Sequence, residues 1–245
     1  MSGHSKWNNI KRKKEKTDAQ KAKVFTKIGR EISVAVREGG ADPANNGKLR
    51  DLIAKAKASN VPNDNIDRII KKAAGEGDKN TYFEMVYEGY GPCGVAVIVD
   101  VLTDNRNRTT AAMKHAFDKF GGNLGAPGCV SYMFEQKGLI TIEKTDAIDE
   151  DALMEAALEA GADDMIVFDD SFEIQTAPDT FNEVNDAIKA AGYEVLDADV
   201  EYVPSMESTP TDADVIKNLK KMIDMLEDND DVQKVYTNCT IDLYE

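Results

Sequence analysis

The 245-residue sequence contains few of the side chains on which most catalytic and metal sites depend. It has two histidines, His4 and His115, and three cysteines that are widely spaced and form no CxxC pair. Zinc sites and Ser-His-Asp triads need such residues, so neither is expected, and we expect no cofactor. An odd number of isolated cysteines is typical of reduced thiols in a cytoplasmic protein.

Long apolar segments are also missing. The longest apolar run, Val95 to Val99, is far too short to span a bilayer. The first residues carry charges but lack the apolar core of a signal peptide. They are rich in Lys and include Glu15 and Asp18, unlike a mitochondrial presequence. We therefore expect a cytoplasmic protein that has no membrane partner.

Positive charge is scarce overall and concentrated at one end of the chain. Residues 1–79 carry a formal charge of +9 and residues 80–245 carry −24, which together give the net charge of −15. Such segregation usually concerns a partner rather than the fold. A nucleic-acid backbone rewards clustered Lys and Arg through counterion release, whereas the alternative is a solvated tail that only aids solubility.

Hydrophobic periodicity predicts three short helices over 18–38, 47–59 and from Asn63 onward. From Tyr82 the pattern becomes strand-like and reads β-β-α-β, the last strand being "CVSYMFEQ". Residues 138–204 read β-α-β-β-α-β with an internal echo, and Thr180 with Glu183 predicts a capping box on the second helix. This element order is that of the ferredoxin-like fold.

The last helix, expected to be capped near Thr211, and the last strand, "VQKVYTNCTI", cannot bury an apolar face alone. We expect them to return and complete the β-β-α-β unit. The predicted class is α+β, with an N-terminal three-helix domain and two ferredoxin-like α/β domains, one inserted in the other. The predicted limits are 1–79 for the arm and helices, 80–135 with 206–245 for the middle domain, and 136–205 for the inserted domain.

Residues 1–16 lack hydrophobic periodicity and are predicted to form a basic N-terminal arm. The candidate binding residues are the cations of this arm and of the first helix, with an aromatic residue of the arm that can stack on a base. Two arginines of "TDNRNRTT" lie at a predicted helix start, where the helix dipole disfavours them, so they contact either an outside anion or an internal acid such as Asp100 or Asp104. The predicted nucleic-acid-binding residues are Lys6, Trp7, Lys11, Arg12, Lys13, Lys14, Lys16, Lys21, Lys23, Lys27, Arg30, Arg106 and Arg108.

Two further motifs have simple structural explanations. Glycine-rich "FGGNLGAPG" lacks the lysine of a Walker loop and the GxGxxG spacing, so a helix C-cap and a loop explain it better than a phosphate cradle. The carboxylates around "DEDALMEAALEAGADD" fall on a predicted exposed helix face, where solvation explains them. Because no nucleophile, base or metal constellation emerges, we expect a protein that binds and is not an enzyme.

Several longer motifs resemble one family. "GHSKWNNIKRKK", "DAQKAKVFTKIGREI", "GGADPANNGKLR", "YEGYGP", "DNRNRT", "GGNLGAPG" and "MIDMLEDNDDVQKVYTN" are similar to segments of the YebC/PmpR family. Cys129 is a mild departure, since a small hydroxyl residue is expected there. The resemblance implies a helical domain with two α/β domains, one inserted in the other, and a cytoplasmic nucleic-acid-binding role in gene expression.

The resemblance leaves two roles open. Members are described as DNA-binding transcriptional regulators, bacterial members also as ribosome-associated factors, and organellar relatives as translational activators of cytochrome c oxidase. The connections "GGADPANNG" and "NVPND" are not obviously the tight turn of a helix-turn-helix. A Lys-rich arm also suits ribosomal or transfer RNA and the ribosome. A small-molecule sensor is a third class, supported by fold analogy alone.

Overall fold

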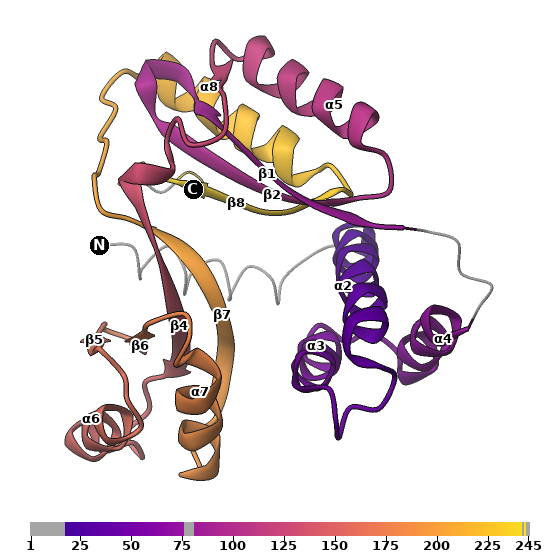
Figure 1. Ribbon diagram of the computed structural model, residues 1–245. Coiled ribbons are helices and arrows are strands. Elements are labelled where there is room, and N and C mark those ends of the chain that lie inside the picture. The colour runs from indigo at the N-terminus through magenta and orange to yellow at the C-terminus, as the bar shows by residue number, and fades with distance from the viewer. Residues whose placement is uncertain (1–17, 76–80, 242, 244–245) are drawn as a thin grey trace. The chain divides into compact units, whose positions relative to one another are not determined.

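The computed structural model describes residues 18–75, 81–241 and 243 (Figure 1). One compact unit runs from Met133 to Glu207, and the other combines the described residues before Met133 with those from Ser208 onward. Among the described residues, no helix combines the length and the apolar character needed to cross a bilayer.

The N-terminal helices are α2 (Asp18–Gly39), α3 (Gly47–Ala58) and α4 (Asn63–Ala74). Ile28, Ile32 and Ala35 recur at helical spacing on α2 and pack in one core with the other two helices. Asn46 fixes the connection between α2 and α3. Its side chain accepts a hydrogen bond from the Leu49 amide at 3.0 Å and donates to the Ala35 carbonyl at 2.8 Å.

The first sheet contains β1 (Phe83–Tyr90), β2 (Ala96–Thr103), β3 (Asn123–Leu124) and β8 (Val232–Thr237). Within the described residues it has four antiparallel strands in the order β3-β1-β2-β8. Helices α5 (Arg106–Lys119) and α8 (Ala213–Glu227) cover the same face of this sheet (Figure 1). The pairing of β8 with β2 confirms that the C-terminal segment returns to complete the earlier sheet.

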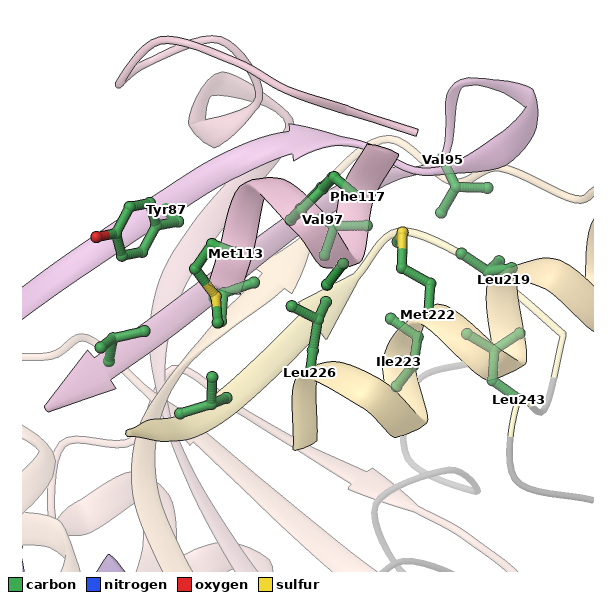
Figure 2. Close-up of a cluster of buried hydrophobic side chains, with 14 residues drawn as sticks. Tyr87, Val95, Val97, Met113, Phe117, Leu219, Met222, Ile223, Leu226 and Leu243 are labelled. Atoms are coloured by element: carbon green, nitrogen blue, oxygen red, sulfur yellow. The ribbon is translucent and has the colours of Figure 1, made fainter. Parts of the chain in front are cut away.

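The core of this sheet lies between its strands and the two helices. Val97, one of the alternate residues of β2 that face inward, packs toward Phe117 of α5. Figure 2 shows Leu219, Met222 and neighbouring apolar side chains of α8 pointing at the same cluster. The apolar stripe of α8 therefore closes a core that the middle of the chain leaves open.

The second sheet belongs to the Met133–Glu207 unit. Its strands are β4 (Phe134–Glu143), β5 (Asp164–Val167), β6 (Ser171–Thr176) and β7 (Val195–Pro204), and its helices are α6 (Glu150–Glu159) and α7 (Phe181–Ala190). The strand order β5-β6-β4-β7 is that of the ferredoxin-like fold, as predicted. Ile140 and Ile142 of β4 pack with both helices in its core.

The two sheets have the same spatial order, which confirms the predicted fold class. In the first sheet, β1 takes the position that β6 has in the second, although β1 comes first in the chain. The first sheet is thus a permuted version of the ferredoxin-like arrangement.

The strand predicted at "CVSYMFEQ" is wrong for residues 129–133, and the last three residues belong to a strand of the other sheet. Ser131–Met133 forms a 3-10 turn (η2), Phe134 begins β4 of the other sheet, and the first sheet uses the two-residue β3 instead. The cause is Glu88, whose carboxylate accepts hydrogen bonds from the backbone amides of Val130 and Ser131. These amides therefore cannot join a strand ladder. The predicted limit between the middle and inserted domains, at positions 135 and 136, lies inside strand β4.

One predicted helix cap is wrong and another is confirmed. Thr180 makes no side-chain cap, because its backbone is already helical and its hydroxyl donates to the Ala177 carbonyl at 3.3 Å. The cap expected near Thr211 lies at Asp212, whose carboxylate accepts hydrogen bonds from the amides of Asp214 and Val215. A carboxylate also suits the positive end of the helix dipole.

The packing of α8 predicts that the first sheet depends on its apolar stripe. Leu219 is fully buried, so Leu219→Ala should lower the free energy of unfolding by about 2–5 kcal/mol. Asn218→Ala, on the exposed side of the same helix, is the matched control and should change it by less than about 0.5 kcal/mol. Urea denaturation measures both, and equal effects would contradict the packing.

Candidate nucleic-acid interface

The predicted binding residues divide into two groups. Lys6, Trp7, Lys11, Arg12, Lys13, Lys14 and Lys16 lie outside the described residues, and so does the side chain of Lys21. The structure places the side chains of Lys23, Lys27, Arg30, Arg106 and Arg108. As contacts to nucleic acid, all of these residues remain predictions.

The cations on the first turns of α2 face the carboxyl end of α8. Lys23 Nζ lies 2.6 Å from Asp228 Oδ1, and Lys27 Nζ donates to the Glu227 carbonyl oxygen at 2.8 Å. The four-residue spacing puts both lysines on one face of α2. The last turn of α8 contains no basic residue of its own, so α2 supplies the positive charge that the negative end of the helix dipole favours.

Arg30 and Arg108 meet at one buried carboxylate, that of Asp231. Arg30 Nη1 lies 2.6 Å from Asp231 Oδ1, and Arg108 Nη2 lies 2.7 Å from Oδ2. The hydroxyl of Thr109 donates to Oδ2 at 2.7 Å. The Asp231 side chain is only 4% exposed, so the charged donors and the hydroxyl replace the water that it loses.

These contacts determine the charge state of Asp231. Burial alone would raise the pKa of the carboxyl group, but the hydrogen bonds from Arg108, Thr109 and Arg30 outweigh it and hold the pKa below its ordinary value of 3.8. Arg108 also pairs with Asp104 at 2.8 Å. Arg108 was expected to contact either an outside anion or an internal acid, and in the structure it pairs with the internal acids Asp231 and Asp104.

Arg106 differs from Arg108. Its guanidinium lies 4.0 Å from the centre of the Phe83 ring, on the exposed first turn of α5. Asn105 caps this helix by accepting from the Arg108 amide at 3.0 Å. A guanidinium stacked on an aromatic ring keeps its donors available to an anion, and this arrangement is compatible with the predicted secondary contact.

The glycine-rich loop is a cradle for an internal anion. The carboxylate of Glu88 accepts from the amides of Gly128, Val130 and Ser131 at 2.7, 3.0 and 2.8 Å. Burial alone would raise the pKa of Glu88, but these amides outweigh it and lower the pKa from 4.5. Of these three amides only that of Gly128 belongs to "FGGNLGAPG", and the chain's own carboxylate occupies it in place of a phosphate.

The site predicted from the sequence leaves out two basic residues of α3. A shallow groove of about 590 Å³ is lined by apolar residues, by the cations Arg50 and Lys57 and by the acidic Asp67. The charge count over residues 1–79 includes these cations, but the predicted site stopped at Arg30. Extending the site to the whole basic region would have included them.

The connection between α3 and α4, which the segment "NVPND" did not clearly identify as a tight turn, is short. It spans 59–62, and Asn60 takes a left-handed conformation with φ 59°. This length is within the range of a helix-turn-helix turn. However, α4 begins with Asp64 and Asp67, both exposed, and carboxylates at the leading end of a recognition helix repel DNA phosphates.

The Asp231 cluster predicts a pH-dependent loss of stability. Asp231→Asn should lower the free energy of unfolding at neutral pH by about 3–5 kcal/mol, because two arginines lose their buried counter-charge. Since the folded-state pKa is depressed, the contribution is fully present above pH 3.8 and is lost as pH falls through the folded-state pKa. The difference in free energy of unfolding between wild type and variant, measured by urea denaturation, should therefore become smaller below pH 3.8. A difference that stays constant there would contradict this account.

The Glu88 cradle predicts a second stability effect. Glu88→Gln should cost about 1–3 kcal/mol of stability, because a neutral amide has one acceptor oxygen and cannot satisfy the three amides as the carboxylate does. Glu84→Gln makes the same change at an exposed position of β1 and serves as the control. Similar denaturation midpoints for the two variants would contradict the structural role of Glu88.

Comparison with known proteins adds independent findings. The chain is 60% identical to a "Probable transcriptional regulatory protein" of Acetivibrio thermocellus over 97% of this chain and 98% of that protein. It is 58% identical to one of Clostridium novyi, over 97% and 96% of the two chains. A crystal structure of a conserved hypothetical protein from Aquifex aeolicus is similar with a TM-score of 0.81 and 43% identity, covering 92% of each chain.

Family comparison covers nearly the whole sequence. Residues 5–76 match the TACO1/YebC protein N-terminal domain, and residues 82–239 match the TACO1/YebC second and third domain. The resemblance seen in the motifs is thereby confirmed: the chain belongs to the TACO1/YebC family.

Proposed function

We propose that this chain is a non-enzymatic, nucleic-acid-binding regulator of gene expression, and that it acts on transcription by binding DNA in the cytoplasm. One observation carries the proposal: residues 1–79 carry a net positive charge, whereas the remainder of the chain is strongly acidic. The names of the relatives from Acetivibrio thermocellus and Clostridium novyi support a regulatory role.

A binding role without catalysis is supported by the buried carboxylates of Asp231 and Glu88, which bind groups of the chain itself. Asp231 and Glu88 are the kind of buried carboxylates that serve as catalytic groups in enzymes, but here internal donors occupy both of them. Their depressed pKa values keep them ionised at neutral pH, which suits charge pairing rather than proton transfer. We assign both residues to stability.

The binding element in this proposal is the N-terminal basic region. The arm residues and the first turns of α2 neutralise phosphates, Trp7 stacks on a base, and Arg106 adds a secondary contact. Phosphate contacts of this kind determine affinity more than sequence preference.

A second candidate function is that of a translation factor that binds ribosomal or transfer RNA. The acidic start of α4 favours it, because Asp64 and Asp67 do not suit a helix that reads the major groove. A basic segment that contains an aromatic residue can instead bind folded RNA.

Crosslinking in cells, followed by sequencing of both DNA and RNA, separates the two candidates. Enrichment at discrete promoters is the expected result for the transcriptional role. Enrichment of ribosomal or transfer RNA would replace it with the translational role. Enrichment of neither would contradict nucleic-acid binding.

The arm itself can be tested in vitro. Replacing Lys11, Arg12, Lys13 and Lys14 by Ala should weaken binding and reduce the slope of log affinity against log salt by about three, because up to four phosphate contacts are lost. A matched control replaces four exposed lysines of α5 and α8: Lys114, Lys119, Lys217 and Lys221. An arm variant whose salt slope equals that of wild type would exclude the arm as the binding element.

A further inference from the structure

The carboxyl end of α8 is an unusually acidic helix terminus. Asp224, Glu227 and Asp228 lie in its last turn or at its cap, where the helix dipole already places partial negative charge. Burial, and then the negative charge of Asp228, raise the pKa of Asp224. This terminus therefore gains from cations supplied by another element.

Its partner is the face of α2 that the sequence predicts to bind phosphates. Lys23 contacts a carboxylate oxygen of Asp228, and Lys27 contacts the carbonyl oxygen of Glu227. One acceptor is a charged carboxylate oxygen and the other is a carbonyl oxygen at the negative end of the helix dipole, so both attract a lysine as a phosphate oxygen does. The lysines would make the same kind of bond to phosphate oxygens.

The contacts between α2 and this acidic segment differ in how readily they exchange. The side chains of Lys23 and Asp228 are 39% and 76% exposed, so their ion pair is screened and costs little to break. The Arg30–Asp231 pair is 16% and 4% exposed, and opening it would leave a buried charge without its partner. Arg30 thus holds α2 against the segment while the lysines can change partners.

We propose that the carboxyl end of α8, residues 227 and 228, competes with a nucleic-acid backbone for Lys23 and Lys27, while the Arg30–Asp231 pair stays closed. This inference rests on the proposed function, and it names the regulation of the same surface. The acidic terminus therefore lowers the affinity of this surface for any phosphodiester chain.

Two single variants isolate this competition. Asp228→Asn removes the carboxylate that holds Lys23. Asp230→Asn removes the same charge two residues later, where, in the described structure, the residue meets α2 only through its backbone carbonyl to Arg30. Both positions are exposed, so both variants are expected to fold.

The measurement is fluorescence anisotropy with a labelled single-stranded RNA oligonucleotide and a DNA duplex of the same sequence. Asp228→Asn should bind about three- to fivefold more tightly than Asp230→Asn at equal ionic strength, with a salt slope steeper by about one. Adding Lys23→Ala to Asp228→Asn should remove this gain.

The outcomes separate this inference from the proposed function. Binding by wild type with equal affinities of Asp228→Asn and Asp230→Asn would overturn the competition and leave the proposed function in place. A gain in Asp228→Asn that persists after Lys23→Ala would also overturn it. Absence of binding to both probes in every variant would overturn the two together.

Discussion

The arrangement of α2, α5 and the first sheet depends on the hydrogen bonds and ion pairs of one buried carboxylate, that of Asp231. It joins α2 through Arg30, α5 through Arg108 and Thr109, and the segment before β8 in which it lies. Its own backbone carbonyl accepts from the Leu102 amide at 2.8 Å, so side chain and main chain act at one point. A charge this deeply buried is tolerated because the arginines and the hydroxyls donate hydrogen bonds to it. Removing any one of these donors would leave the buried carboxylate partly unsatisfied, at a cost in free energy of folding.

Much of the fold follows from local pattern. Periodicity located the helices from Asp18 onward, and the internal echo in residues 138–204 revealed the ferredoxin-like order. The errors arose where a distant side chain decides the local backbone. Glu88 binds the amides of the segment predicted as a strand, and nothing in the spacing of "CVSYMFEQ" shows that a residue some forty positions earlier will do so. The cap predicted at Thr180 fails for a local reason instead, because the Thr180 backbone is already helical and its hydroxyl bonds the Ala177 carbonyl.

The candidate site was less accessible to sequence reasoning. Charge density identified the basic region, because electrostatic segregation survives any folding pattern. It could not show that Arg30 and Arg108 share Asp231, since the partner lies more than a hundred residues away in the chain. An arginine that a sequence assigns to an outside anion is often neutralised internally, and only tertiary structure distinguishes the two cases. The positions of Lys57 and Arg50 around a groove likewise depend on how α3 meets α4.

The interrupted first sheet has a consequence for synthesis on the ribosome. Strands β1 and β2 emerge early, but their core lacks α8 and β8 until the end of the chain has been translated. The Met133–Glu207 unit has all of its strands in one continuous stretch and can fold before that point. In the nascent chain, the apolar face of β2 therefore stays uncovered while the Met133–Glu207 unit is translated and folds. Closing so long a loop is slow, and this interval is when the chain is most exposed to aggregation and most in need of a chaperone.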